Sequence, residues 1–266
     1  EVKQLTKDFG GRAAVTDLNF KLVPGEILGF LGPNGAGKST TMKMLTGYLR
    51  PTSGRASIWG CDVWLDTLSA QKHIGYLPEG APLYEEMTPV SFLSFIAEAR
   101  GLKGAERQIA VDQSIVKMAL GSVLEQKIET LSKGFKRRVG LAQAILHDPD
   151  VLILDEPTDG LDPNQNYEVR EMIKGLSKDK IVIISTHILE EVTAVCNRVM
   201  VLAGGRIVSD SSPADFIAKS AYHGAVTLSI KELSLTDDII EAFGQLQQVK
   251  DVQATGDLLT VFPMPG

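Results

Sequence analysis

The stretch Gly32-Pro33-Asn34-Gly35-Ala36-Gly37-Lys38-Ser39 decides the fold. It matches the phosphate-loop pattern in full: a glycine, four free positions, then Gly-Lys followed by Ser or Thr. An apolar run at residues 26–31 precedes it, and Met42, Leu45 and Leu49 follow it at helical spacing. A loop between a strand and a helix is the context that the motif requires, so this interpretation is favoured over a chance glycine-rich turn.

Each part of this loop suits phosphate binding. The glycines let backbone N–H groups turn toward phosphate oxygens, Lys38 can reach the β- and γ-phosphates, and the Ser39 hydroxyl can ligate Mg²⁺. The positive end of the following helix adds to the attraction. We therefore predict that residues 32–40, including Thr40, bind a nucleotide.

A second informative segment is residues 151–156, where four apolar residues precede Asp155 and Glu156. The apolar run predicts a central strand, and ligands of open α/β sheets lie beyond the carboxyl ends of the strands. We expect Asp155 to hold Mg²⁺ through water and Glu156 to act as general base toward the γ-phosphate. Two solvated acids at a strand end are common in isolation, but the phosphate loop favours the catalytic interpretation.

Two further segments fit the same crevice. His187 follows the predicted strand at residues 181–184, and we expect it to contact the γ-phosphate. Residues 131–135 (LSKGF) precede a helical pattern, where Ser132 and Gly134 could bind an anion at the helix N-terminus. That second motif is weak alone, because capping serines are common, and it gains weight from lying upstream of the strand at residue 151.

The order of patterns along the chain predicts its organisation. Residues 1–60 indicate strands and turns, and apolar strands alternate with amphipathic helices after residue 150, which predicts a mainly parallel sheet covered on both faces. Residues 88–148 between them are mainly helical, with helices expected at residues 104–120 and 134–147, which indicates a helical subdomain inserted into an α/β core.

The C-terminal part carries its own signals. Gly204-Gly205 predicts a hairpin, and a boundary is expected near Ser220. Beyond it, a strand at residues 225–230, a helix and a hairpin at Gly256-Asp257 indicate a small α+β tail. The chain ends just after the last predicted strand, so we expect this tail to be cut short.

Composition excludes several classes of protein. Hydrophobic residues make up 44% of the 266-residue chain and charged residues 23%, which are ordinary values for a globular protein. The net charge of −6 argues against a nucleic-acid surface. Two distant cysteines, Cys61 and Cys196, argue against a disulfide framework and favour a reducing cytosol. No apolar run approaches the ~18 residues of a membrane span, so any membrane role is expected to come through a partner.

The order of these motifs resembles the ATP-binding cassette (ABC) ATPases over residues 1–219. The phosphate loop and residues 151–156 match the Walker A and Walker B motifs of that family. Residues 131–135 resemble the signature usually written LSGGQ, and Gly160-Leu161-Asp162 matches the D-loop.

Three further positions extend the resemblance. Phe9 lies where the family places an aromatic residue on adenine, and His187 matches the switch histidine. Two segments are most similar to bacterial ABC-2 exporters, including the gliding-motility-associated subgroup. They are the stretch from Ile74 to Leu77 and into Glu79, and the residues of the signature motif at 131–135.

The resemblance implies an architecture and an activity. The expected fold is α/β, a P-loop NTPase core of ABC type over residues 1–219, with an antiparallel β subdomain and a helical subdomain at about 88–148. A small α+β tail follows at residues 220–266. The implied activity is hydrolysis of ATP with Mg²⁺, in which Lys38, Glu156 and His187 are catalytic and Glu79 joins Ser39 and Asp155 at the metal.

The resemblance also implies partners. ATP bound by one subunit of a homodimer or heterodimer would be capped by Ser132 and Gly134 of the other, and dimer closure would drive an integral membrane permease. The chain would then be cytoplasmic, on the inner face of the inner membrane through that permease, with no nucleic-acid partner. The permease is expected to dock at residues 79–87 and the helical subdomain, with Leu83 and Tyr84 as candidate contacts.

The sequence departs from the family pattern in two places. Glu79 stands where the family usually has Gln, which adds negative charge near the γ-phosphate although a carboxylate can still ligate Mg²⁺. The signature has Lys133 for a Gly and Phe135 for the final Gln.

Three alternatives remain open at this stage. A soluble ABC ATPase outside transport is the first, although such proteins usually carry two cassettes or long coiled coils. A regulatory cassette that binds ATP without turnover is the second, and Glu156 argues against it. A GTPase is the third, and the chain lacks the Asn-Lys-x-Asp guanine motif.

Overall fold

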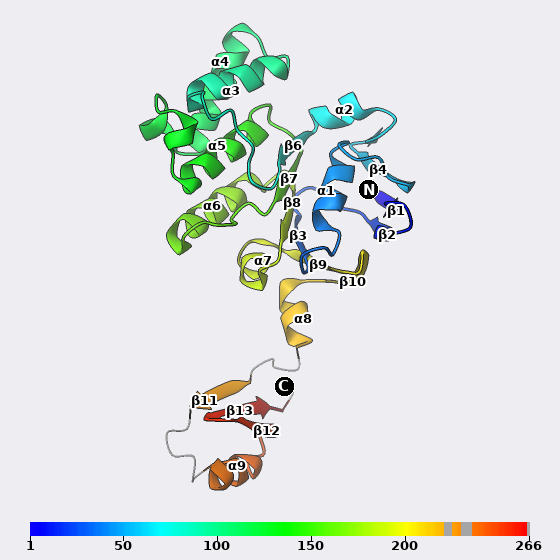
Figure 1. The fold of residues 1–266 in the computed structure, drawn as a ribbon, viewed down its shortest axis with the longest axis vertical. Coiled ribbons are helices and arrows are strands. Elements are labelled where there is room, and N and C mark those ends of the chain that lie inside the picture. The colour runs from blue at the N-terminus through cyan, green and yellow to red at the C-terminus, as the bar shows by residue number, and fades with distance from the viewer. Residues whose placement is uncertain (221–224, 230–235, 265–266) are drawn as a thin grey trace. The chain divides into compact units, whose positions relative to one another are not determined.

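A computed structural model describes residues 1–220, 225–229 and 236–264 (Figure 1). The chain divides into two compact units, Glu1–Pro213 and Ala214–Gly266, and each is described by itself. The division falls shortly before the boundary predicted near Ser220.

A six-stranded sheet forms the centre of the first unit, in the order β10-β9-β3-β8-β7-β6. Five of these strands run parallel, as predicted, and β10 pairs antiparallel with β9 through the Gly204-Gly205 hairpin. The strands are β3 (Ile27–Leu31), β6 (Ile74–Leu77), β7 (Val151–Asp155), β8 (Ile181–Thr186), β9 (Arg198–Ala203) and β10 (Arg206–Ser211).

Helices cover both faces of this sheet. Helix α1 (Lys38–Leu45) lies on one side, and α5 (Lys133–Ile145), α6 (Pro163–Leu176) and α7 (Leu189–Val195) lie on the other (Figure 1). Every residue of β7 and β8 is buried, because both faces of these strands pack against other layers. Alternate side chains of the two strands enter two separate apolar clusters, one with α1 and one with the helical subdomain.

A four-stranded sheet in the order β2-β1-β4-β5 forms the predicted β subdomain. Its strands, all paired antiparallel, are β1 (Val2–Asp8), β2 (Ala13–Phe20), β4 (Ser53–Ile58) and β5 (Cys61–Asp62). The short helix α2 (Thr67–Lys72) leads from this sheet to β6. Leu18 and Phe20 lie on the same face of β2, and both side chains are buried.

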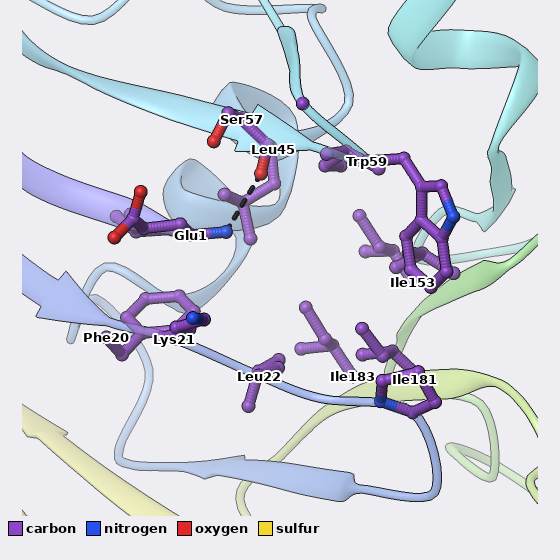
Figure 2. A pocket seen from close by; sticks show the side chains of 15 residues that line it. Glu1, Phe20, Lys21, Leu22, Leu45, Ser57, Trp59, Ile153, Ile181 and Ile183 are labelled. Carbon is purple, nitrogen blue, oxygen red and sulfur yellow. Dashed lines mark hydrogen bonds between the residues drawn. The ribbon is translucent and has the colours of Figure 1, made fainter.

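An apolar pocket of about 310 Å³ lies between this sheet and the central one (Figure 2). The side chains of Phe20, Leu22, Trp59, Ile153 and Ile183 line it. It lies against the opening residues and midsections of β7 and β8, whereas ligands of such sheets bind beyond the carboxyl ends of the strands. The position expected for a ligand is therefore the opposite end of the sheet, beyond Asp155 and Thr186.

The helical subdomain begins where the sequence predicts. Helix α3 (Pro89–Ala99) has Thr88 as its N-cap, and α4 (Gly104–Lys117) and two short 3₁₀ turns lead to α5. The expectation of a helix to residue 120 was wrong, because Ala119 adopts a φ of 49°. The helix after the phosphate loop is likewise shorter than Leu49 suggested: Gly47, with a φ of 78°, follows its C-cap.

The second unit is a small α+β fold. A sheet in the order β11-β13-β12 is built from β11 (Val226–Ser229), β12 (Val249–Thr255) and β13 (Leu258–Pro263). Helix α8 (Pro213–Ala218) leads into it, and α9 (Thr236–Gly244) packs against β12. The hairpin predicted at Gly256 joins β12 to β13, while Ile230 of the predicted strand lies outside the described residues.

Within the described ranges, the chain forms no helix that is both long and apolar enough to cross a bilayer.

Candidate nucleotide site

The phosphate loop connects β3 to α1, and two of its glycines have no room for a side chain. Gly37 caps α1 with a φ of 104°, and a Cβ there would lie 2.6 Å from the Ala14 carbonyl oxygen. A Cβ on Gly32 would lie 2.4 Å from the carbonyl oxygen of Leu202. The loop is therefore packed closely against two other segments of backbone, at Ala14 and Leu202.

Lys38 is buried at the first position of α1. Its ammonium donates to the carbonyl oxygen of Gly32 at 2.7 Å and lies 3.7 Å from Glu156 Oε1. The charge is thus held over the loop and next to the predicted general base. This position suits contact with the terminal phosphates of a nucleotide in the loop.

Ser39 and Asp155 meet at the expected metal position. The Ser39 hydroxyl lies 3.3 Å from Asp155 Oδ1, which also accepts a hydrogen bond from Ser185. Asp155 is 1% exposed at the end of β7. A hydroxyl and a carboxylate converging at the phosphate loop form the oxygen-rich donor set that Mg²⁺ prefers, so these residues fit that ion.

Glu156 follows β7 in a left-handed conformation, with a φ of 49°. Its N–H is held by the carbonyl and hydroxyl oxygens of Ser185, each at 3.1 Å. Its Oε2 lies 3.1 Å from Nδ1 of His187. Burial raises the pKa of Glu156, while the neighbouring His187 and Lys38 act in the opposite direction. A carboxylate with a raised pKa in a phosphate site has the character of a general base.

A cavity of about 780 Å³ opens in front of these groups. Its walls include residues 33–40, Phe9, Glu79 and Glu156, so the structure brings four predicted parts of the site together. The Phe9 side chain is 53% exposed, and its ring has the Lys7 ammonium 5.0 Å from its centroid. This exposed ring can offer a stacking surface for a base.

Some wall residues were missed from the sequence. Arg12, Ala14 and Gly205 also line the cavity. The Gly205 N–H donates to the Ala36 carbonyl at 3.2 Å, and a Cβ on Gly205 would lie 2.7 Å from the Ala14 carbonyl oxygen. The hairpin predicted from Gly204-Gly205 therefore packs against the phosphate loop. Gly205 was the sequence feature that could have indicated this close contact.

Ser132 and Gly134 lie elsewhere. Among the described residues that line the cavity, neither appears. Ser132 caps α5 and accepts the Phe135 N–H at 3.3 Å, whereas the space beside Gly134 is filled by Gln165 of α6. In one copy of the chain, the predicted anion-binding segment is therefore separate from the phosphate loop.

The signature helix is tied to the D-loop. The buried Arg137 donates from Nη2 to the Asp159 carbonyl oxygen at 3.3 Å. Phe135, one of the two unusual signature residues, has the Arg138 guanidinium 5.3 Å from its ring centroid. The Phe135 ring also packs against the apolar cluster of the helical subdomain.

Known proteins resemble this chain in sequence and in structure. The family described as ABC transporter matches residues 15–159. YhcH of Bacillus subtilis, an uncharacterized ABC transporter ATP-binding protein, is 39% identical over 210 residues, which are 78% of this chain and 68% of YhcH. YbhF of Escherichia coli, a probable multidrug ABC transporter ATP-binding protein, is 38% identical over 222 residues, and the match spans 83% of this chain and 38% of YbhF.

The structure of CbiO1 from Clostridium perfringens, described as part of the transporter complex CbiONQ, superposes with a TM-score of 0.75 at 29% identity. The superposition covers 82% of this chain and 90% of CbiO1.

Proposed function

Because this chain belongs to the ABC transporter family of ATP-binding proteins, as an ATPase subunit, we propose that it uses the site at the phosphate loop to power a separate membrane permease. The observation that carries the assignment of the site is the position of Glu156. Its carboxylate is 3.1 Å from His187 and 3.7 Å from Lys38, at the mouth of the phosphate cavity.

The proposed roles follow from this geometry. Residues 32–40 bind the phosphates of ATP, and the Phe9 ring stacks on the base. Glu156 accepts a proton from the attacking water, and His187 contacts the γ-phosphate from the other side. Lys38 neutralises charge that develops on the transferred phosphoryl group.

Mg²⁺ is proposed to bind at Ser39 and Asp155, with Glu79 as a further ligand. The ion would neutralise phosphate charge and orient the terminal phosphoryl group. Ser185 supports this arrangement, because its hydroxyl donates to Asp155 and leaves the other carboxylate oxygen for a water of the ion.

The second half of the site is proposed to come from another subunit, identical or related. Ser132 and Gly134 lie at a helix N-terminus suited to a phosphate, yet they do not line the cavity of their own chain. A head-to-tail dimer would bring them over the ATP held by the partner's phosphate loop. Closure and opening of this dimer would then be linked to the nucleotide state.

The permease is proposed to dock beside the segment that follows Glu79. Tyr84, Met87 and Phe95 line an apolar hollow of about 360 Å³ there, and Tyr84 is 57% exposed. The hollow is formed by the segment that follows Glu79 and by Phe95 of α3, so a movement of Glu79 can reach it through a short segment of chain. The chain would be held at the cytoplasmic face of the membrane through this contact.

Tyr84→Ala is expected to weaken binding of the permease by about 30-fold, because an aromatic anchor in an apolar hollow contributes about 2 kcal/mol and each 1.4 kcal/mol corresponds to a factor of ten. Recovery of the permease in co-purification from detergent measures this loss. Where an adjacent gene encodes a multi-span membrane protein, that protein is co-expressed with this chain as the probe. Tyr167→Ala is the control, since Tyr167 is exposed on α6, away from the hollow. Equal recovery with both variants would place the permease elsewhere.

Phosphate release from MgATP by the purified chain tests the proposed function of the site. Turnover that saturates with ATP and disappears in Glu156→Gln is the expected result. ATP binding without turnover would instead indicate a regulatory cassette.

Glu79→Gln is expected to weaken Mg²⁺-dependent ATP binding by about tenfold, since a hard cation prefers a charged oxygen ligand. Titrations of ATP and ADP at several Mg²⁺ concentrations measure it. Tighter binding of ATP relative to ADP would show that Glu79 repels the γ-phosphate instead of ligating the metal. No change in either affinity would show that Glu79 faces away from the nucleotide.

A further inference from the structure

A third buried acid, besides Asp155 and Glu156, lies close to the hydrolytic groups. Glu191, in the first turn of α7, is 6% exposed. Its Oε1 accepts hydrogen bonds from the Thr158 hydroxyl at 2.5 Å and the Asn166 amide at 3.2 Å. Its Oε2 accepts the Thr186 hydroxyl at 2.6 Å. Burying a carboxylate is unfavourable unless donors surround it, so three donors from three segments indicate a specific arrangement.

The two threonines belong to the two loops that carry the hydrolytic groups. Thr158 lies two residues after Glu156, within a turn closed by the Asp159 N–H and the Glu156 carbonyl at 3.3 Å. Thr186 directly precedes His187, and its hydroxyl oxygen also accepts the Ile188 N–H at 3.1 Å. Each oxygen of Glu191 therefore holds one of these loops.

The third donor, the Asn166 amide, connects Glu191 to the segment that follows the D-loop. Asn166 lies in the first turn of α6, and its own amide oxygen accepts the Arg170 Nε–H at 2.7 Å, which fixes the orientation of the amide. The Leu161 N–H donates to the Thr158 carbonyl at 3.3 Å. Glu191 thus holds the residues on both sides of Gly160-Leu161-Asp162.

We propose that Glu191 is a positioning residue for ATP hydrolysis, which sets the spacing of Glu156 and His187 and couples that pair to the D-loop. It acts through Thr158 and Thr186. The inference rests on the proposed roles of Glu156 and His187. A carboxylate suits the task because both of its oxygens accept and neither donates, whereas glutamine would turn an NH₂ group toward one set of donors.

The test compares Glu191→Gln and Glu191→Ala with Glu190→Gln and Glu190→Ala. Glu190 is the neighbouring residue in the same helical turn and is exposed, so it matches the change in charge and sequence position. We expect kcat to fall about tenfold in Glu191→Gln and on the order of 100-fold in Glu191→Ala, because displacements near 1 Å have effects of this size. ATP affinity should stay within about twofold, and the Glu190 variants should match the unsubstituted chain.

A double-mutant cycle tests whether Glu191 acts through Thr186. If Glu191 acts through Thr186, then Glu191→Ala combined with Thr186→Val should lower kcat little more than the larger single effect. Unchanged kcat in Glu191→Gln, or losses of kcat and ATP affinity in equal proportion, would overturn the inference. Independent, multiplying effects in the cycle would overturn the route through Thr186. An unsubstituted chain that fails to hydrolyse MgATP would instead overturn the proposed function, and the inference with it.

Discussion

Lys38→Ala is expected to raise the dissociation constant for ATP by about 100- to 1000-fold. The substitution removes a buried ammonium that lies over the phosphate loop, 2.7 Å from the Gly32 carbonyl. Hydrogen bonds to charged groups contribute about 1.5–3 kcal/mol each, and each 1.4 kcal/mol corresponds to a factor of ten. Isothermal titration with ATP measures the effect.

Lys43→Ala is the matched control for this result. Lys43 lies on the same helix and is exposed, so its loss changes the net charge equally without altering the loop. Thermal unfolding of both variants would separate lost binding from lost folding. A Lys38→Ala protein that is folded and binds ATP normally would show that the phosphates lie elsewhere.

Glu156→Gln is expected to bind ATP but lower kcat by about 10²- to 10⁴-fold, the range attributed to general base catalysis. The amide keeps the shape of the side chain but cannot accept the proton of the attacking water. Since hydrolysis would normally reopen the dimer, the variant should accumulate as a dimer in MgATP. Phosphate release and light scattering measure the two effects.

Glu190→Gln serves as the control in both assays. A Glu156→Gln protein that stays monomeric in MgATP and hydrolyses at the normal rate would contradict the proposed role. The unsubstituted chain provides a further check, because burial raises the pKa of Glu156. Its rate should fall as the pH is lowered through that raised pKa, at a higher pH than for an ordinary glutamate.

The family and the core of the fold could be predicted because their signals are local. The phosphate loop and the strand at 151–154 each occupy a few consecutive residues, and neighbouring strands of a parallel sheet bring their carboxyl ends together. Asp155 and Ser185 are paired in register, which explains why two segments distant in sequence meet at one edge.

Other parts of the site could not be predicted from short segments of the sequence. The contact of Gly205 with Ala14 and Ala36 joins three segments, and no single window of sequence contains it. Glu191 is similar, because an acid in the first turn of a helix is ordinary until its partners are known. The end of α4 was misjudged because the left-handed turn at Ala119 comes just before Leu120, which is fully buried in the core.

The alternation of side chains along β7 has a mechanical consequence. Leu152 and Leu154 are embedded in the apolar cluster of the helical subdomain, while Val151 and Ile153 are embedded in the cluster beneath the β subdomain. Strand β7 therefore packs into the apolar clusters of both the helical subdomain and the β subdomain. A tilt of the helical subdomain would pull on Leu154, which directly precedes Asp155 in the chain. In the proposed function, force from a docked permease would reach the Asp155 carboxylate along the backbone of β7, and a change at the nucleotide would travel outward by the same route.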